Sequence, residues 1–191
     1  MLTAGASRRQ RLRARVHEAH ENLDGLIGAL ETARDYQRYL MGMAAFRLAA
    51  EAAIEICRFP SWLDAWQPIS TRVALKEDLA TLRLPCVTVP ALAPPETDSG
   101  LLGMLYTLEG SALGARLIAK RAKALGYDEV FGATHLAVQT AAPENWRVFL
   151  DLLEAAPVFD LDEAGAAASR LFRNAYDAMI LADHAGDKVH G

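Results

Sequence analysis

Apolar residues recur at intervals of three and four positions along almost the whole chain, and this spacing constrains the fold more than any other feature. Between residues 7 and 32 it lines one face of a helix. The apolar positions there are Leu12, Val16, Ala19, Leu23, Ile27 and Leu30. Alanine is abundant, and runs of β-branched residues that would favour strands are nearly absent. The sequence therefore predicts an all-α fold.

Prolines and glycines divide this pattern into at least six predicted helices. They cover about residues 7–32, 34–57, 69–84, 98–126, 143–156 and 161–186. Ser7 and Asp160 are suited to helix starts, Pro143 to a first turn and Gly126 to the position after a helix. Because no repeat or linker divides the chain, we expect a single domain over residues 1–191, a multi-helix bundle with flexible termini at 1–7 and 187–191.

Charge and cysteine usage exclude several classes of partner. A formal net charge of −4 argues against general binding to nucleic acid or to a membrane surface. Cys57 and Cys86 form neither a CxxC pair nor a disulfide framework, which is typical of reduced thiols in a cytoplasmic protein. The N-terminal arginines are not followed by the apolar segment of a secretory signal, and no apolar stretch reaches the roughly 18 residues of a membrane span.

Two histidines, His17 and His20, lie three positions apart in the first predicted helix. At about 100° per residue, His20 lies roughly 60° from the centre of the apolar face and His17 roughly 120° away. We therefore expect His20 to point toward the interior or an adjoining cleft, and His17 toward solvent. His20 is then either a core-edge histidine satisfied by a carboxylate or a ligand to a metal or cofactor.

The same helix begins with a concentration of arginines at positions 8, 9, 11, 13 and 15. Arg13 and Arg9 precede His20 by seven and eleven residues, so both fall within roughly 20° of its line on the helix. An imidazole with guanidinium groups about 10 Å away suits a ligand that has a metal centre and peripheral carboxylates. The alternative is a basic terminus that only aids solubility.

Three glycines form a line on the predicted helix 98–126. Gly103, Gly110 and Gly114 are spaced at seven and four residues, within roughly 20° of one line. Each costs about 1 kcal/mol relative to alanine inside a helix, so three on one face indicate a specific requirement. A face without side chains lets the backbone approach a flat ligand, and it equally permits tight helix–helix packing. Glu109, beside this line, is expected on the exposed surface.

Two motifs resemble the bacterial heme oxygenase family, especially members encoded beside bacteriophytochromes. The segment LYTLEGSALGARLIAKR, residues 105–121, is similar to the distal helix of that family, and LRARVHEAHENLDG, residues 12–25, to its proximal helix. LKEDLATL and ENWRVFLDLLE fit later helices in the same order. The resemblance spans about residues 10–185 and implies a heme oxygenase-like bundle.

The resemblance also implies a set of site residues. His20, not His17, takes the place of the proximal iron ligand, and Asp24 is a candidate partner for its second nitrogen. Gly110, Ser111 and Gly114 take the distal face over the heme, with Gly110 and Ser111 assisting proton delivery through ordered water. Two arginines correspond to basic positions that bind heme propionates. They are Arg13 and Arg147.

The reaction implied by the resemblance is oxidative opening of heme to biliverdin, carbon monoxide and iron. Heme is both substrate and cofactor, and dioxygen and electrons from an external reductase are needed, since this chain has no flavin or nicotinamide fingerprint. A bacteriophytochrome is one possible acceptor of the biliverdin. Two departures from the family pattern, Val16 and Ala115, leave room for a narrowed pocket or altered regiochemistry.

Three other classes of helical protein were weighed against this hypothesis. A di-iron carboxylate oxidase needs Glu-x-x-His pairs, which the chain lacks. A histidine phosphotransfer module would need a more exposed histidine and leaves the glycine line unexplained. A non-catalytic tetrapyrrole-binding protein uses the same residues and remains the main alternative.

Overall fold

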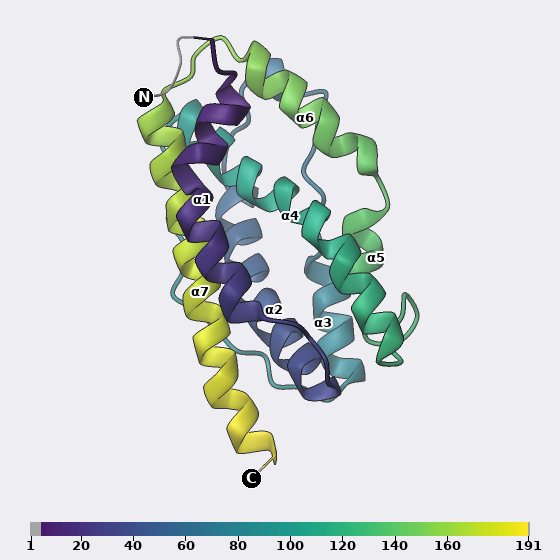
Figure 1. The fold of residues 1–191 in the computed structure, drawn as a ribbon. Coiled ribbons are helices and arrows are strands. Elements are labelled where there is room, and N and C mark those ends of the chain that lie inside the picture. The colour runs from purple at the N-terminus through teal and green to yellow at the C-terminus, as the bar shows by residue number, and fades with distance from the viewer. Residues whose placement is uncertain (1–4, 191) are drawn as a thin grey trace.

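The computed structural model describes residues 5–190 and, for side chains, residues 5–186 (Figure 1). Seven α-helices and one short 3-10 helix form this part of the chain, which confirms the predicted all-α fold. The helices are α1 (Arg8–Ile27), α2 (Ala33–Glu55), η1 (Ser61–Leu63), α3 (Arg72–Thr81), α4 (Asp98–Ala124), α5 (Thr134–Thr140), α6 (Pro143–Ala155) and α7 (Leu161–His190). None of the described helices is both long and apolar enough to cross a bilayer.

Local capping signals account for most helix starts. The Ser7 side chain accepts a hydrogen bond from the Gln10 backbone N–H, and the Gln10 side chain accepts one from the Ser7 backbone N–H, so α1 begins with a capping box. Pro143 occupies the first turn of α6, and the Asp160 carboxylate accepts from backbone N–H groups at the start of α7. Gly126, with φ of 90°, follows the end of α4 as predicted.

Several helix bounds differ from the sequence prediction: α3 covers residues 72–81 and not 69–84, and α7 continues to residue 190 and not 186. Helix α1 ends at Ile27 and not near residue 32, because Gly28 and Leu30 adopt positive φ values of 73° and 51°. Leu30 is buried, as expected of the apolar face, but it lies after the end of α1 and not within the helix. The seven-residue α5 was not predicted. Of the termini expected to be flexible, residues 1–4 and 191 lie outside the described residues.

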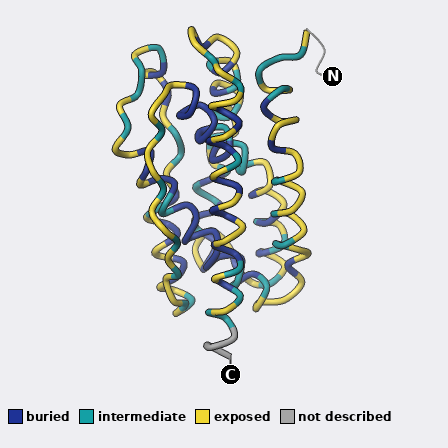
Figure 2. The backbone as a smooth tube through the Cα atoms, turned by 90° about the vertical axis from the view of Figure 1, so that its left-hand side faces the viewer, coloured by how far each residue is buried: buried dark blue, intermediate teal, exposed yellow. Residues whose placement is uncertain are grey.

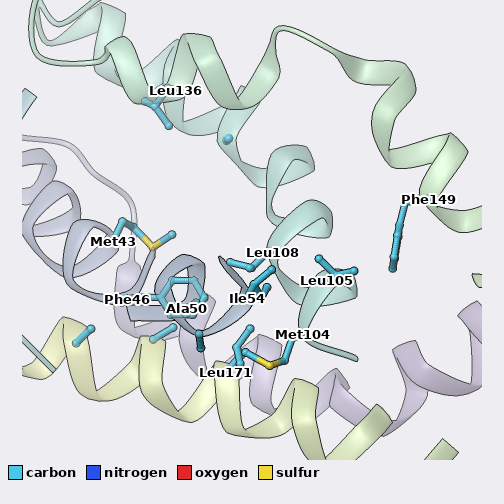
Figure 3. Close-up of a cluster of buried hydrophobic side chains, with 14 of the residues drawn as sticks. Met43, Phe46, Ala50, Ile54, Met104, Leu105, Leu108, Leu136, Phe149 and Leu171 are labelled. Carbon is cyan, nitrogen blue, oxygen red and sulfur yellow. The ribbon is translucent and has the colours of Figure 1, made fainter. Parts of the chain in front are cut away.

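The main hydrophobic core lies where α2, α4 and α7 meet, with α5 and α6 closing it (Figures 2 and 3). Figure 3 shows the side chains that interdigitate there. They include Met43, Phe46, Ala50 and Ile54 of α2, Met104, Leu105 and Leu108 of α4, and Leu171 of α7. A separate, smaller cluster joins Leu12 and Val16 of α1 to Ala164 and Ala168 of α7. Helix α7 thus supports α1 on one face and the main core on another.

The line of glycines on α4 has more than one structural role. A Cβ atom placed on Gly103 would lie 2.0 Å from the Ala164 carbonyl oxygen, so this glycine permits the close crossing of α4 and α7. At Gly110 a Cβ would lie 3.4 Å from the Trp146 ring of α6. At Gly114 no atom lies within 4 Å of that position. Tight helix–helix packing therefore explains Gly103, whereas no packing contact accounts for Gly114.

We expect Gly103→Ala to lower the free energy of unfolding by about 1–3 kcal/mol, because its methyl group meets backbone atoms that cannot rotate away. Gly114→Ala is the matched control on the same helix. Its methyl group meets open space, so helix propensity should raise stability by about 0.5–1 kcal/mol. Urea denaturation of the ligand-free proteins measures both values. Equal stability of the two variants would contradict this division of the glycine line.

Candidate functional site between α1 and α4

The side chains of His17 and His20 are exposed to a similar extent, 63% and 58%. Both histidines are therefore exposed, and the expectation that His20 is much more buried than His17 is wrong. Their contacts differ, however, because the His20 ring meets the Phe172 ring of α7 edge-to-face at a centroid distance of 5.7 Å. His20 thus lies along the contact between α1 and α7. The described side chain that His17 meets is Glu21 on its own helix.

One nitrogen of His20 is held by a carboxylate. Nδ1 lies 3.0 Å from Oδ2 of Asp24, one turn further along α1. Because an ionised carboxylate only accepts hydrogen bonds, Nδ1 is the nitrogen that donates to Asp24, and in the neutral tautomer with this hydrogen the lone pair is on Nε2. Nε2 contacts no hydrogen-bonding group among the described residues. One ring nitrogen of His20 is thus engaged by Asp24, and the other has no partner among the described residues.

The glycine-containing side of α4 faces the end of α1. Gly110, Gly114, Leu117 and Arg121 follow one another at intervals of four, three and four residues, and so share one side of the helix. Arg121 donates to the carbonyl of Gly28, directly after α1, at 3.4 Å. Leu117, just before it, remains 53% exposed, as does Leu113. This part of α4 therefore presents apolar groups and bare backbone toward α1.

The N-terminal half of α1 meets the same side of α4. Tyr106, one turn before Gly110, packs against the cluster that α1 forms with α7. Burial raises the pKa of Tyr106, while the nearby charges of Arg9 and Arg13 act to lower it. Contacts near both ends of α1 thus place this helix beside the part of α4 that carries Gly110 and Gly114. We call the region of α1 and α4 that carries Arg13, His20, Gly110 and Gly114 the inter-helix site; Figure 1 shows the two helices.

The arginines of α1 separate into structural and available groups. The Arg8 guanidinium donates to the carbonyls of Leu153 and Ala156 and lies over the Phe159 ring. Arg15 pairs with Asp162 of α7. Arg13 is exposed and pairs with no described acidic side chain. Only part of the basic segment is therefore needed to attach α1 to the bundle.

Helix α6 covers the side of the site next to Gly110. Its Trp146 ring lies against Gly110 and 5.5 Å from the Tyr106 ring, measured between centroids. Arg147, the next residue, is exposed and has no acidic partner in the described part of the chain. The second predicted basic residue thus lies on a helix that borders the site, although no measured contact brings it to His20.

The two departures from the family pattern are both core residues. Val16 is 3% exposed and packs between α1 and α7. Ala115 is also 3% exposed and belongs to the main core, so its methyl group points away from the open position at Gly114. Neither side chain narrows the inter-helix site.

The hydroxyl group of Ser111 is directed toward α2 and α5. It donates to the Leu108 carbonyl at 2.6 Å and accepts from Gln139 Nε2 at 2.7 Å and from Arg47 Nη1 at 3.3 Å. One donor hydrogen and two acceptor positions are all that a hydroxyl offers. The side chain of Ser111 is therefore fully occupied, and its link to the inter-helix site is through the backbone of α4.

Glu109 is buried, contrary to the expectation of an exposed surface residue, with only 3% of its surface accessible. Its carboxylate accepts from the Ile69 backbone at 2.9 Å and from Asn145 Nδ2 at 2.8 Å. Burial raises the pKa of this carboxyl above its ordinary value, although both hydrogen bonds act in the opposite direction. Glu109 therefore joins α4 to the loop before α3 and to α6.

A buried histidine–aspartate pair, which was not predicted from the sequence, anchors α5. Asp78 of α3 accepts from the backbone N–H groups of Thr134 and His135 and from His135 Nδ1, the last at 2.7 Å. Both side chains are almost fully buried. Burial lowers the pKa of His135, whereas in Asp78 the hydrogen bonds from His135 outweigh burial and the pKa also lies below its ordinary value. The pair is thus a neutral imidazole and a carboxylate.

This pair makes stability depend on pH. A lowered pKa means that the unfolded chain takes up a proton on His135, near its ordinary value of 6.5, before the folded protein does. The free energy of unfolding should therefore fall as the pH decreases from about 7 to about 5, by at most about 1.4 kcal/mol per pH unit. His135→Asn retains an amide donor for Asp78 and should remove this part of the slope. Urea denaturation across this range, with His17→Asn as the exposed control, measures it; a wild-type slope in His135→Asn would refute the assignment.

Comparisons with known proteins agree with this all-helical fold. No family model matches the chain. It is 30% identical over 167 residues to the heme oxygenase PigA of Pseudomonas aeruginosa, covering 84% of each chain. A heme oxygenase of Xanthomonas campestris pv. campestris is 34% identical over 93 residues, 48% of this chain and 54% of that one.

A solved structure confirms the fold. The NO- and CO-bound heme oxygenase from Neisseria meningitidis superposes with a TM-score of 0.73, covering 92% of this chain and 91% of that chain at 24% identity. Together with the similarity to the Pseudomonas protein along most of both chains, the comparison defines a helical protein of the heme oxygenase class. The chain belongs to the heme oxygenase family.

Proposed function

We propose that this chain binds heme in the inter-helix site and opens it oxidatively to biliverdin, carbon monoxide and iron, acting as one domain over residues 1–191. The observation that supports this most directly is the pairing of His20, whose Nε2 is available, with the open backbone at Gly114 across the site. A flat ligand with a central metal needs one donor on one side and an unobstructed surface on the other. The residues present fit heme in both respects.

The part played by His20 follows from its contacts. Nε2 would bind the iron, while the hydrogen bond from Nδ1 to Asp24 fixes the tautomer and the orientation of the ring. Phe172 supports the ring from α7. Bound heme would supply iron for the activation of dioxygen, with its own macrocycle as the substrate.

On the opposite side, α4 controls access. Gly114 leaves space for dioxygen and ordered water, and Gly110 presents backbone beside Trp146. We assign Gly110 and Ser111 to the catalytic side of the pocket as predicted. Ser111 acts there by fixing the backbone of α4, because its hydroxyl group donates to the Leu108 carbonyl. The exposed Leu113 and Leu117 would gain burial against an apolar macrocycle.

Two arginines are available for the carboxylates at the edge of heme. Arg13 lies two turns before His20 on the same side of α1, and the charge of Arg13 also acts on Tyr106 across the site. Arg147 extends from α6, which borders the site. A guanidinium group can form two parallel hydrogen bonds to a propionate and so fix how the ring is rotated in its plane.

The reaction further requires partners outside this chain. Electrons are expected from a separate reductase, and a bacteriophytochrome remains one possible acceptor of biliverdin. The reduced cysteines favour a cytoplasmic location. Each of these remains a prediction from the sequence and the family resemblance.

We expect hemin to give a Soret band with the wild-type protein, and His20→Ala to lose the iron–imidazole form of that band. His17→Ala is a closely matched control, because His17 is equally exposed and also lies next to a carboxylate one turn further along the helix. Titration followed by absorbance, and ascorbate under oxygen to test conversion to a green product, measure binding and turnover. A Soret band that survives in His20→Ala but not in His17→Ala would contradict the assignment. Binding without turnover would identify a heme carrier.

Gly114→Leu should weaken hemin binding about tenfold or more, since the new side chain occupies the open surface of α4, while the ligand-free protein keeps its stability. Gly25→Leu is the control, because Gly25 is also an unobstructed helical glycine but lies on α1 away from the line of His20. Hemin titration and thermal unfolding of the ligand-free proteins are compared. Equal hemin affinity in the two variants would mean that Gly114 does not face the ligand.

A further inference from the structure

The most extensively bonded buried side chain in the described region is Arg47 of α2. It is 2% exposed. Its guanidinium group is paired with Glu51 at 2.9 Å and also donates to the Thr71 hydroxyl and to the Ile69 carbonyl. Burial acts to raise the pKa of Glu51, but the charge of Arg47 and the hydrogen bonds from Ser70 and Thr71 outweigh it, so the pKa lies below its ordinary value. The buried pair is thus ionised and fully hydrogen-bonded.

The remaining face of the Arg47 guanidinium contacts α4. Nη1 donates to the Leu108 carbonyl at 3.2 Å and to the Ser111 hydroxyl at 3.3 Å. Ser111 itself donates to the same carbonyl. Two side-chain donors therefore converge on one carbonyl of a helix at the residues on either side of Gly110. A planar guanidinium group can satisfy all of these acceptors at once, which an ammonium group cannot.

This contact lies where α4 is least able to define its own position. Glycine has the lowest helix propensity after proline, so the segment between Gly110 and Gly114 gains little from the helix itself. The side that faces the inter-helix site also lacks packing at Gly114. On the opposite side it is held by the buried Ala115, by the Arg47 contacts and by the hydrogen bond from Gln139 to Ser111.

We propose that Arg47 is a positioning residue that fixes the Gly110–Gly114 segment of α4 relative to α2, and thereby sets the shape of the inter-helix site. The structural part of this proposal concerns the ligand-free protein. Its consequence for the ligand rests on the proposed function. Arg47 itself contacts α2, α4 and the loop before α3, so it acts on the site only through Leu108 and Ser111.

The test compares the ion pairs of two arginines on α2, Arg47 with Glu51 and Arg38 with Asp183 of α7. The Arg47→Met, Glu51→Gln double variant removes the pair without leaving a lone buried charge. The Arg38→Met, Asp183→Asn double variant is the matched control, because Arg38 also pairs with a carboxylate and donates to two backbone carbonyls, those of Leu26 and Ile27, but at the end of α1. Amide hydrogen exchange is measured in the ligand-free proteins over residues 110–117, with residues 98–106 of the same helix as reference.

We expect exchange over residues 110–117 to become about tenfold faster or more in the Arg47 double variant, with little change over 98–106 and none of this pattern in the Arg38 double variant. Unchanged exchange over 110–117, or equal acceleration in both double variants, would overturn the proposal. If the Arg47 double variant does not fold, Arg47→Lys decides in the same way, because it keeps the charge beside Glu51 but loses the planar fork.

A second measurement concerns the ligand. With hemin bound, we expect the Arg47 double variant to bind about tenfold more weakly and to change the ratio of biliverdin isomers, since a displaced α4 no longer holds the macrocycle in one orientation. A general loss of stability would not alter that ratio. If wild-type protein fails to bind hemin, the proposed function fails while the exchange result still decides the role of Arg47. If wild type binds and the variant retains its affinity and isomer ratio, the positioning role in the site is overturned.

Discussion

The structure depends on how closely other helices can approach α7. Its contact faces consist largely of alanine, and Ala164 receives both the Gly103 backbone of α4 and the Leu12 cluster of α1. Such close approach leaves no space for larger side chains at the crossing. Because α1 and α4 both pack on α7, that helix sets much of their separation, together with the contacts of Tyr106 and Arg121. A site between two helices can then stay open at Gly114 while both helices remain fixed.

The attachment of α1 leaves its central part available. At the N-terminal end, Glu154 of α6 accepts from the backbone N–H groups of Arg8 and Arg9, and at the C-terminal end Arg38 donates to the last carbonyls of the helix. Between these points, His20 makes its contacts with Asp24 and Phe172. The helix is thus held at both ends, and Nε2 of His20 has no partner within the described part of the chain.

The limits of prediction from sequence follow from the range of the interactions. Helix starts were predictable because their signals are local, as with Ser7 and Gln10. Helix α5 was not, since its first turn is held by Asp78, which is more than fifty residues away in the chain. The burial of Glu109 depends likewise on Ile69 and Asn145. A helical wheel placed His20 on the correct side of α1 but not its exposure, because exposure depends on where the neighbouring helix lies.

The line of glycines on α4 shows why one sequence pattern can hold two requirements. Gly103 is needed for packing, whereas Gly114 is needed only if something occupies the space beside it. A helix segment without packing contacts on one side is positioned by contacts on its opposite side, which for α4 is the side that faces α2 and α5. The buried Arg47–Glu51 pair supplies that hold, and because it is charged and surrounded by specific acceptors it fixes direction as well as distance. Nonpolar packing has no such directional preference, so it would set the distance between α4 and α2 but not the position of α4 along that contact.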